Sequence, residues 1–162
     1  MAEQIDRFER IVRGIDALGF DVEVRQSPEH PFELRNIHPS LPAVVWSLFD
    51  DGHYSQATFE AFKFVDKEVA RISAASDSGY KLMMKAFSET APMIKLTACG
   101  STSEIDEQKG FMFLFSGSTM AIRNPRGHEY AVHDSPDECL DHLALVSLLL
   151  RRIQSAGYAL IA

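Results

Sequence analysis

The sequence predicts a mainly α protein, an up-and-down bundle of about four to five helices with an N-terminal helical extension and one long loop. Two observations predict this fold class. Apolar residues recur three or four positions apart in most segments, which is the period of a helix packed on one side. Glycine, proline and polar turn residues separate these segments. With 162 residues, 46% of them hydrophobic, the chain suits one domain with a proper core and is short for two.

The N-terminal part of the chain is predicted to be an extension. Residues 5–18 keep an amphipathic helical pattern that Gly19 can end. Residues 20–37 alternate briefly and then contain prolines, a composition that favours an extended connector or a short edge strand over a helix. We therefore divide the chain into an N-terminal helix and extended connector, residues 1–37, and a helical domain, residues 38–162.

The first half of the helical domain is predicted to hold helices of different lengths. A short helix covers residues 41–49 and ends at an Asp-Asp-Gly turn. A longer helix covers residues 54–72, where one apolar stripe runs along an otherwise charged surface, so we expect it to be the backbone of the bundle. A further short helix covers residues 81–87.

The long loop is predicted at residues 88–109, because this segment has no steady hydrophobic period and contains Pro92 and Gly100. A loop of this length in a compact domain needs a reason. It could contain a short strand at residues 93–96 or act as a mobile flap, and the sequence supports either. A strongly apolar helix is expected to follow over residues 110–122.

The last predicted helix has a clear N-terminal signal. Ser135 can cap it, Pro136 suits its first position, and acidic residues follow near the positive end of the helix. From Leu140 to Ile153, almost every direction around the helix carries an apolar side chain. Such a helix is either central or shared with another subunit. In a domain this small we expect the second arrangement, a homodimer contact through the last helix.

The composition limits the functions open to this chain. With 16 Lys and Arg against 23 Asp and Glu, its net charge of -7 argues against a broad basic surface that coats nucleic acid. Any nucleic-acid contact has to be local. Cys99 and Cys139 are too few for a disulfide framework and lack metal-ligand spacing, which fits inert thiols in a reducing cytosol. The N-terminus does not read as a signal peptide and no run is apolar enough for a membrane span, so we expect a cytoplasmic protein.

The segment from Arg123 to Tyr130 is the most informative one, because it places a permanent cation, an amide, an imidazole and a phenol on eight consecutive residues. Pro125 disfavours the helical conformation at Asn124 and removes a backbone donor, so we expect the helix to end there. In a continuing helix, Arg123 and His128 would be rotated by roughly 140° from each other and could not share a ligand. The predicted break lets His128 fold back toward Arg123, in a site suited to phosphate.

Three places carry a resemblance to a known family: the stretch from His38-Pro39 to His53-Tyr54, residues 60–63, and the run from Gly117 through Arg123-Asn124-Pro125 to His128. On these residues, the chain from His38 to Arg152 resembles the bacterial Ymh-type family of the HEPN superfamily. In that superfamily a helical bundle carries an Arg, a short spacer and a His. This spacing is a weak signal alone, and the flanking pattern makes it fairly specific.

Many members of this superfamily are metal-independent endoribonucleases of toxin–antitoxin and phage-defence systems, and they work as dimers that bring two Arg/His motifs together. The resemblance therefore implies catalytic roles for Arg123 and His128, with Asn124 as the polar neighbour beside the Arg. It also implies that Tyr130 matches the Tyr of one toxin subgroup. There a partner nucleotidyltransferase silences the enzyme by adenylylating that Tyr.

Each candidate residue also has a plain structural interpretation. Arg123 could be a cation at a helix C-terminus, His128 a solvent-facing loop residue, and Asn124 a turn residue before proline. Arg126 could bind the RNA substrate or simply be solvated, and Tyr130 could anchor the loop. The histidines and aspartates of the C-terminal region lack metal-ligand spacing, so we expect no metal and no other cofactor.

The function that the sequence favours is a metal-independent endoribonuclease that cleaves single-stranded RNA by 2′-hydroxyl attack at a composite homodimer site. Histidine suits the proton transfers because its pKa lies near neutral pH, and Arg123 offers a planar, always-charged group that matches phosphate oxygens. The alternative is a non-catalytic helical module that dimerises, or binds a nucleotide or a partner protein, in a defence or stress operon. The negative net charge slightly favours this alternative.

Overall fold

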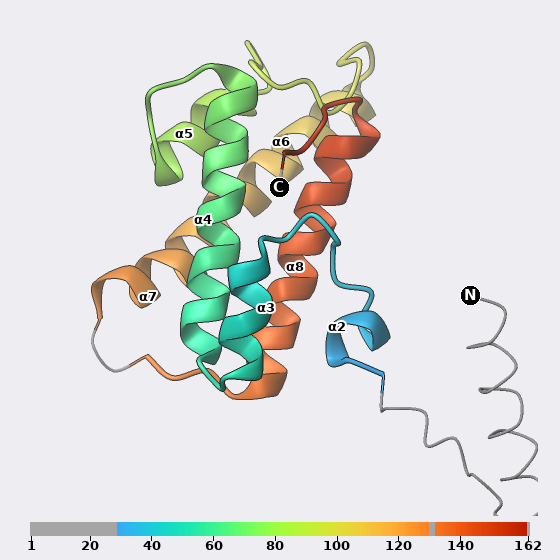
Figure 1. The fold of residues 1–162 in the computed structure, drawn as a ribbon. Helices are drawn as coiled ribbons and strands as arrows, with labels where there is room; N and C mark the ends of the chain where they lie inside the picture. Colours follow the sequence, from blue (N-terminus) through green and yellow to red (C-terminus); the bar gives the residue numbers. More distant parts are fainter. Residues whose placement is uncertain (1–28, 130–131, 162) are drawn as a thin grey trace, which may run out of the picture.

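The computed structural model describes residues 29–129 and 132–161, and these residues form a bundle of helices without a strand (Figure 1). Its elements, in chain order, are α2 (Pro31–Leu34), α3 (Ala43–Asp50), α4 (Tyr54–Ser73), α5 (Gly79–Ala86), α6 (Thr102–Ser118), η1 (Thr119–Arg123), α7 (Asn124–His128) and α8 (Pro136–Ser155). The element η1 is π-helical. The predicted fold class, a mainly α helical bundle, is confirmed. The helix predicted over residues 5–18 lies outside the described residues.

The two longest helices, α4 and α8, pack side by side through the middle of the bundle, and α6 passes behind them in Figure 1. α4 buries the apolar stripe predicted for it, with Ala57, Ala61 and Val65 almost inaccessible to solvent. Because α3, α5 and α8 all pack on α4, its predicted role as the backbone of the bundle is confirmed. No helix in the described part of the chain is long and apolar enough to cross a membrane.

α8 begins where the sequence predicts, and its burial corrects the role expected for it. Ser135 and Glu138 form a capping box at its N-terminus, since each side chain bonds the other residue's backbone N–H. Buried side chains cover most of the helix: Cys139, Leu140, Leu143, Val146, Ser147, Leu149, Leu150 and Ile153. Among its large apolar side chains, Leu148 alone is exposed. The apolar character of α8 is therefore used inside one subunit, and the structure favours the central arrangement over the shared one that we predicted.

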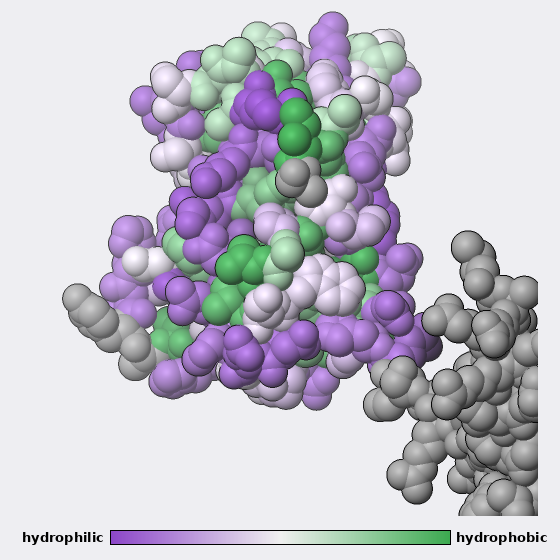
Figure 2. All heavy atoms as spheres, viewed as in Figure 1, coloured by the Kyte–Doolittle hydropathy of each residue, from purple (hydrophilic) through white to green (hydrophobic). Residues whose placement is uncertain are grey.

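The outer surface of the bundle is mostly hydrophilic on the face that carries α3. Figure 2 shows hydrophobic residues on this face only as small groups among hydrophilic ones. Exposed large hydrophobic side chains elsewhere include Phe113, Leu114 and Met120, which lie on α6 and η1. The helix that leads into the motif segment therefore carries an apolar surface that residues 29–129 and 132–161 leave exposed.

The long loop is shorter than predicted because α6 starts at Thr102 rather than at residue 110. Ser101 accepts a hydrogen bond from the Glu104 backbone N–H, and the Glu104 side chain bonds the Ser101 backbone in return. This capping box lies within residues 88–109, the segment predicted to be the loop. The connection between α5 and α6 is residues 87–101, and no strand forms at residues 93–96.

The buried side-chain amide of Gln108 satisfies backbone groups of this loop in place of a strand. Gln108 is fully buried, and its Oε1 accepts a hydrogen bond from the Leu96 N–H at 2.8 Å. Its Nε2 donates to the carbonyl oxygens of Phe87 at 3.1 Å and Ile94 at 3.0 Å. The loop is thus held by one side chain that satisfies three backbone groups.

Replacing Gln108 with Leu should destabilise the domain by about 2–5 kcal/mol, because three backbone groups of the loop lose their partner while staying shielded from water. Urea unfolding of the full chain measures the change. Asp106→Leu, at an exposed position of the same helix, is the matched control and should change little. A Gln108→Leu protein as stable as the wild type would show that the loop satisfies its backbone in another way.

The connector predicted before the helical domain contains a helical turn. α2 occupies residues 31–34, and the His30 Nδ1 accepts a hydrogen bond from the Phe32 N–H at 3.1 Å at its start. Phe32 is 1% exposed, and its ring centroid lies 4.5 Å from that of Trp46. The extended conformation predicted here is therefore wrong for these residues, because burial of Phe32 against α3 fixes a compact turn after Pro31.

Candidate functional site

The motif segment lies on η1 and α7, which continue α6 instead of ending it. Asn124 has helical dihedral angles, φ −62° and ψ −45°, and its N–H bonds the Thr119 carbonyl in the π-helical pattern. Pro125 stands in the first turn of α7, where proline is tolerated. The predicted end of the helix at Asn124 is therefore wrong. A wider π-helical turn directly before a proline makes room for its ring, which would otherwise clash with the preceding turn.

The continuous helix separates Arg123 from His128. Residues five positions apart in a helix are rotated by roughly 140° about its axis. Arg123 is directed at α4 and at the start of α5, whereas His128 is exposed at the end of α7. The predicted folding back of His128 toward Arg123 is wrong, and a single subunit does not place both side chains on one phosphate.

The Arg123 guanidinium is held in a defined position. Its Cζ lies 5.8 Å from the centre of the Phe59 ring, within cation–π range. Its Nη1 lies beside Gly79, where an added Cβ would be 3.6 Å away. Gly79 has a φ of +62°, which favours glycine, and its N–H donates to the Asp66 carboxylate at 2.6 Å. The start of α5 is thus shaped to form one wall of the Arg123 site.

Arg123 makes no ion pair within the described part of the chain. Its Nε is buried without a hydrogen-bond partner among these residues, and no ion pair joins it to one of their carboxylates. The neighbouring Arg126 is by contrast fully engaged with Asp134. A fixed guanidinium without an acidic partner is a suitable ligand for an anion.

The remaining residues of the motif differ in their accessibility. His128 is exposed, as the solvent-facing interpretation expected, and it ends α7. Asn124 is half-buried at the first residue of α7. Tyr130 lies outside the described residues. Asn124 lies four residues before His128, so helical spacing puts these two on the same side of α7 and turns both away from Arg123.

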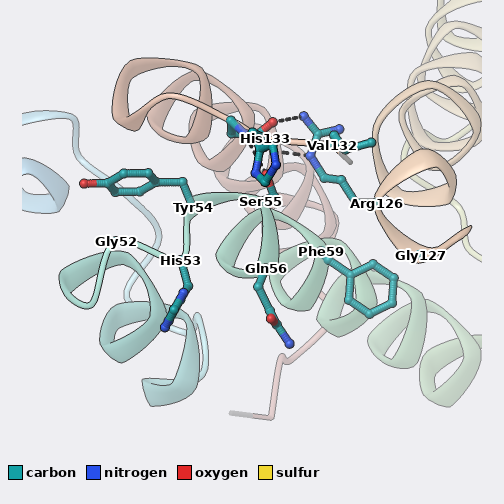
Figure 3. A pocket seen from close by; sticks show the side chains of 11 residues that line it. Gly52, His53, Tyr54, Ser55, Gln56, Phe59, Arg126, Gly127, Val132 and His133 are labelled. Atoms are coloured by element: carbon teal, nitrogen blue, oxygen red, sulfur yellow. Dashed lines mark hydrogen bonds and ion pairs between the residues drawn. The ribbon is translucent and has the colours of Figure 1, made fainter. Parts of the chain in front are cut away.

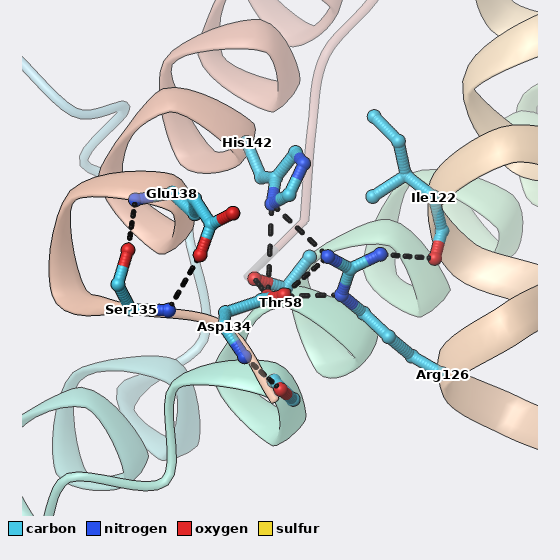
Figure 4. A network of polar contacts seen from close by, with 8 residues as sticks. Thr58, Ile122, Arg126, Asp134, Ser135, Glu138 and His142 are labelled. Atoms are coloured by element: carbon cyan, nitrogen blue, oxygen red, sulfur yellow. Dashed lines mark hydrogen bonds and ion pairs between the residues drawn. The ribbon is translucent and has the colours of Figure 1, made fainter. Parts of the chain in front are cut away.

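Arg126, predicted as a substrate-binding residue, is part of a buried ion pair (Figure 4). Its Nε donates to Asp134 Oδ2 at 2.9 Å, and its Nη2 donates to the other carboxylate oxygen. Its Nη1 donates to the Ile122 carbonyl at 2.8 Å. The side chains of Arg126 and Asp134 are 9% and 3% exposed. The guanidinium expected to contact RNA is therefore occupied by the protein itself, and it holds α7 to the start of α8.

Asp134 is the centre of a network that joins α4, α7 and α8. The Thr58 hydroxyl donates to its Oδ2 at 2.8 Å, and its own N–H donates to the Ser55 hydroxyl oxygen at 2.7 Å. Burial acts to raise the pKa of the Asp134 carboxyl, but the hydrogen bonds from Arg126 and Thr58 prevail and hold that pKa below its usual value. Burial, and then the charge of Arg126, lower the pKa of His142, which lies beside the pair. The network is therefore centred on the ionised Asp134 carboxylate and its pair with the Arg126 guanidinium.

No pattern in the sequence predicts this network. Arg126 and Asp134 are eight positions apart across a loop, so no helical period pairs them. Asp134 and His142 belong to the C-terminal histidines and aspartates whose spacing does not suit a metal, and both lie against Arg126. Among the described residues, no group of three His, Cys, Asp or Glu side chains is placed to hold a metal ion. Burial raises the pKa of the Cys139 thiol to about 11, so this thiol stays protonated.

A cavity of about 440 Å³ opens between the start of α4 and α7 (Figure 3). Its lining comes from three parts of the chain: residues 52–56 with Phe59, Arg126 with Gly127, and residues 132–134. Gly127 is required for this arrangement, because a Cβ there would lie 2.9 Å from the Phe59 ring. The size is that of a small-ligand site. Phe59 therefore contacts Arg123, packs on α7 and lines the cavity, three roles that no sequence pattern indicated.

The comparisons with known proteins give a family but no activity. Residues 35–153 match the Hypoth_Ymh family, whose description is a protein of unknown function. The chain belongs to this family. The Hypoth_Ymh match spans the motif segment together with the helices from α3 into α8, so the Ymh-type part of the resemblance is confirmed. No match was found among curated proteins or among solved structures.

Proposed function

We propose that this Hypoth_Ymh protein is a HEPN-type, metal-independent endoribonuclease that cleaves single-stranded RNA. The observation that carries the proposal is the Arg123 guanidinium, which is fixed against Phe59 and has no acidic partner among the described residues. It stands next to Asn124 and five residues before the exposed His128. An unpaired arginine can stabilise the phosphorane charge and an accessible imidazole can transfer protons, so these two groups suit phosphodiester cleavage without a metal.

The chemistry proceeds by attack of the RNA 2′-hydroxyl on the adjacent phosphorus. One imidazole takes the 2′-hydroxyl proton as the new O–P bond forms, and a proton is delivered to the 5′-oxygen as the old O–P bond breaks. The products are a 2′,3′-cyclic phosphate and a 5′-hydroxyl. Arg123 stabilises the charge that builds up on the phosphorane oxygens, and Asn124 orients the phosphate. Incubation of the purified chain with single-stranded RNA and a metal chelator, followed by analysis of the product ends, tests this reaction.

Two subunits are needed for a geometric reason. Since Arg123 and His128 of one subunit lie on different sides of the helix, we assign the Arg123 of one subunit and the His128 of its copy to the same phosphate. A two-fold axis next to α7 produces two such pairs from one interface. Each pair supplies one guanidinium and one imidazole to its own phosphate, and the imidazole that takes the 2′-hydroxyl proton returns it to the 5′-oxygen. Mixing of inactive variants, described in the Discussion, separates this arrangement from one in which each subunit acts alone.

The proposed dimer contact is the apolar face of α6 and η1. Phe113, Leu114 and Met120 are 54%, 45% and 53% exposed, and Gly117 lies exposed between them. Positions 113, 117 and 120 fall on one side of a helix. This face leads along the same helix into Arg123 and His128. A second copy seated on it would bring the two motif segments together, which the buried α8 would not.

Met120→Asp is expected to weaken dimerisation by about 10-fold or more, because it would bury a charge in an apolar contact. RNA cleavage should fall with it. Light scattering coupled to gel filtration measures the mass. Leu148→Asp, at the exposed position of α8, is the matched control that tests the contact first predicted. A dimer that survives Met120→Asp and dissociates with Leu148→Asp would restore the α8 interface and reject the α6 face.

The biological setting proposed for this activity is a toxin–antitoxin or phage-defence system. A cleavage activity against cellular RNA needs a partner that keeps it silent. The proposed partner is a nucleotidyltransferase-type antitoxin that modifies Tyr130, a residue outside the described part of the chain. This proposal rests on the family resemblance together with the position of Tyr130 two residues after His128.

A non-catalytic dimerisation or binding module is the second candidate, and two observations favour it. The continuous helix turns Arg123 and His128 apart within one subunit, and the net charge is -7. Such a module would bind a nucleotide or a partner protein through the same residues without breaking a bond. It predicts RNA or nucleotide binding that His128→Ala leaves unchanged, in a protein that never yields a cyclic phosphate.

A further inference from the structure

We propose that the cavity between α4 and α7 is a base-binding subsite, in which one unpaired RNA nucleobase stacks on Phe59 beside the phosphate bound by Arg123. The inference rests on the proposed function and adds a recognition element that the Arg/His motif lacks. Arginine and histidine side chains that act on a phosphate do not hold a base. Single-stranded RNA is generally held by stacking of its bases on aromatic side chains.

Phe59 is placed to serve both groups. Its ring centre lies 5.8 Å from the Arg123 Cζ and 5.9 Å from the Lys63 Nζ. Lys63 lies one helical turn after Phe59 on α4. The Arg123 guanidinium extends in the same direction along α4, toward Gly79, whose N–H donates to Asp66. The cavity lies at the turns before Phe59. The ring therefore borders both the cavity and the two cations, and we place the base on its cavity side with the phosphate near Arg123.

The position of the Phe59 ring is fixed by α7. Gly127 lets the helix approach so closely that a Cβ at this position would meet the ring at 2.9 Å. A ring held in place by backbone loses little conformational entropy when a base stacks on it. Arg123 lies at the start of the same helix, so the base and the phosphate are positioned by one rigid element.

The other groups around the cavity match a base better than a charged ligand. Gln56 is exposed and lies on the same side of α4 as Phe59, three residues before it, and Figure 3 shows both side chains extending from that helix. Its amide has donors and an acceptor for the edge of a base. Arg126 and Asp134 also line the cavity, but they neutralise each other. A nucleobase, which is planar and uncharged, fits such a lining. His53 and His133 also line the cavity.

The direct test is a photocrosslink on the full chain. The probe is a single-stranded RNA oligonucleotide with 2′-O-methyl groups, which block cleavage, and one 4-thiouridine; mass spectrometry then locates the bound residue. We expect the crosslink at Phe59 or at another residue that lines the cavity. Crosslinks found only elsewhere on the chain would overturn the inference, whatever the cleavage activity.

Binding of the same oligonucleotide, followed by fluorescence anisotropy, gives a second readout. Phe59→Ala should weaken it roughly 5- to 150-fold, as the loss of one stacked base does, and Phe59→Tyr should keep it. Because Phe59→Ala also removes a support of Arg123, Gln56→Ala is measured as well and should weaken binding roughly 5-fold or more without touching Arg123. Tyr80→Ala, an exposed aromatic on α5, is the control. Unchanged binding in both cavity variants would overturn the base subsite.

The outcomes separate this inference from the proposed function. Oligonucleotide crosslinked in the cavity of a protein that never cleaves RNA supports the subsite and rejects the ribonuclease. Cleavage without a crosslink in the cavity supports the ribonuclease and rejects the subsite. The absence of any RNA binding rejects both. A mononucleotide that competes as strongly as the oligonucleotide would overturn the inference in favour of a free-nucleotide site.

Discussion

Arg123→Ala and His128→Ala should each lower the rate of RNA cleavage by roughly 10²- to 10⁴-fold while leaving the fold intact. Arg123→Ala removes the only group that we assign to stabilising the phosphorane charge. His128→Ala removes the group that carries the proton. Neither change should cost much stability, because His128 is exposed and Arg123 makes no ion pair with a described residue. Cleavage of a fluorogenic RNA with chelator present measures the rate, and circular dichroism checks the fold.

Two related variants sharpen this expectation. Arg123→Lys should not restore the rate, because a point charge cannot replace a planar fork that binds two phosphate oxygens. Arg126→Lys should act mainly on stability, since Arg126 is engaged with Asp134 rather than with substrate. Growth of bacteria that express the wild type or His128→Ala provides a cellular readout of the toxin proposal. Cleavage that persists in both alanine variants would end the ribonuclease proposal.

Mixing the two inactive variants tests the shared site. In a heterodimer of Arg123→Ala with His128→Ala, one of the two trans sites has its arginine and its histidine intact. Random reassociation of equal amounts makes half of the dimers mixed, so about a quarter of the wild-type activity should return. A site confined to one subunit would regain nothing, since each subunit lacks one group. A mixture that shows no activity would therefore reject the composite site shared by two subunits.

Removal of the Asp134 carboxylate is expected to have the largest effect on stability. Asp134→Ala leaves the Arg126 charge buried without its partner and removes the acceptor used by Thr58, so the free energy of unfolding should fall by about 3–5 kcal/mol. That loss is a large part of the stability of an ordinary domain. Chemical unfolding monitored by circular dichroism measures it. Asp137→Ala, three residues along at an exposed position, is the matched control.

The pH dependence of stability gives this prediction an independent check. The pKa of Asp134 is lower in the folded chain than its ordinary value of 3.8, so the unfolded chain takes up the proton first. The stabilisation is therefore complete above about pH 4 and is lost as the pH falls through the lowered pKa. Asp134→Ala should remove this acid-dependent step. A variant that keeps both the step and the wild-type stability would show that the ion pair contributes nothing.

Much of the helix pattern could be read from the chain, because it depends on local periodicity and on caps. The stripe of α4 and the start of α8 at Ser135 follow from spacing and from capping residues. The late start assigned to α6 was an error of interpretation, since the capping box at Ser101 and Glu104 is present in the sequence. The short α2 was different, because burial of Phe32 decides its conformation.

The candidate site could be located from the sequence but not built from it. Arg123, Asn124 and His128 stand out by their chemistry, and they lie within residues 35–153, which match the family. Their mutual placement depended on whether the helix ends or continues at Pro125. The general preference of proline predicted a break, and a π-helical turn in η1 avoided it. The occupied state of Arg126 depended on Asp134, which approaches it only in the folded chain.

The amino-acid sequence by itself determined that this chain is a helical member of the Hypoth_Ymh family with an Arg/His motif, because helix periods, caps and motif spacing are properties of neighbouring residues. Tertiary structure alone decided that α8 is central, that Arg126 is paired with Asp134, and that Phe59 both contacts Arg123 and lines a cavity. Such contacts join residues far apart in the chain. They follow from packing of whole helices, whose net free energy no local pattern contains.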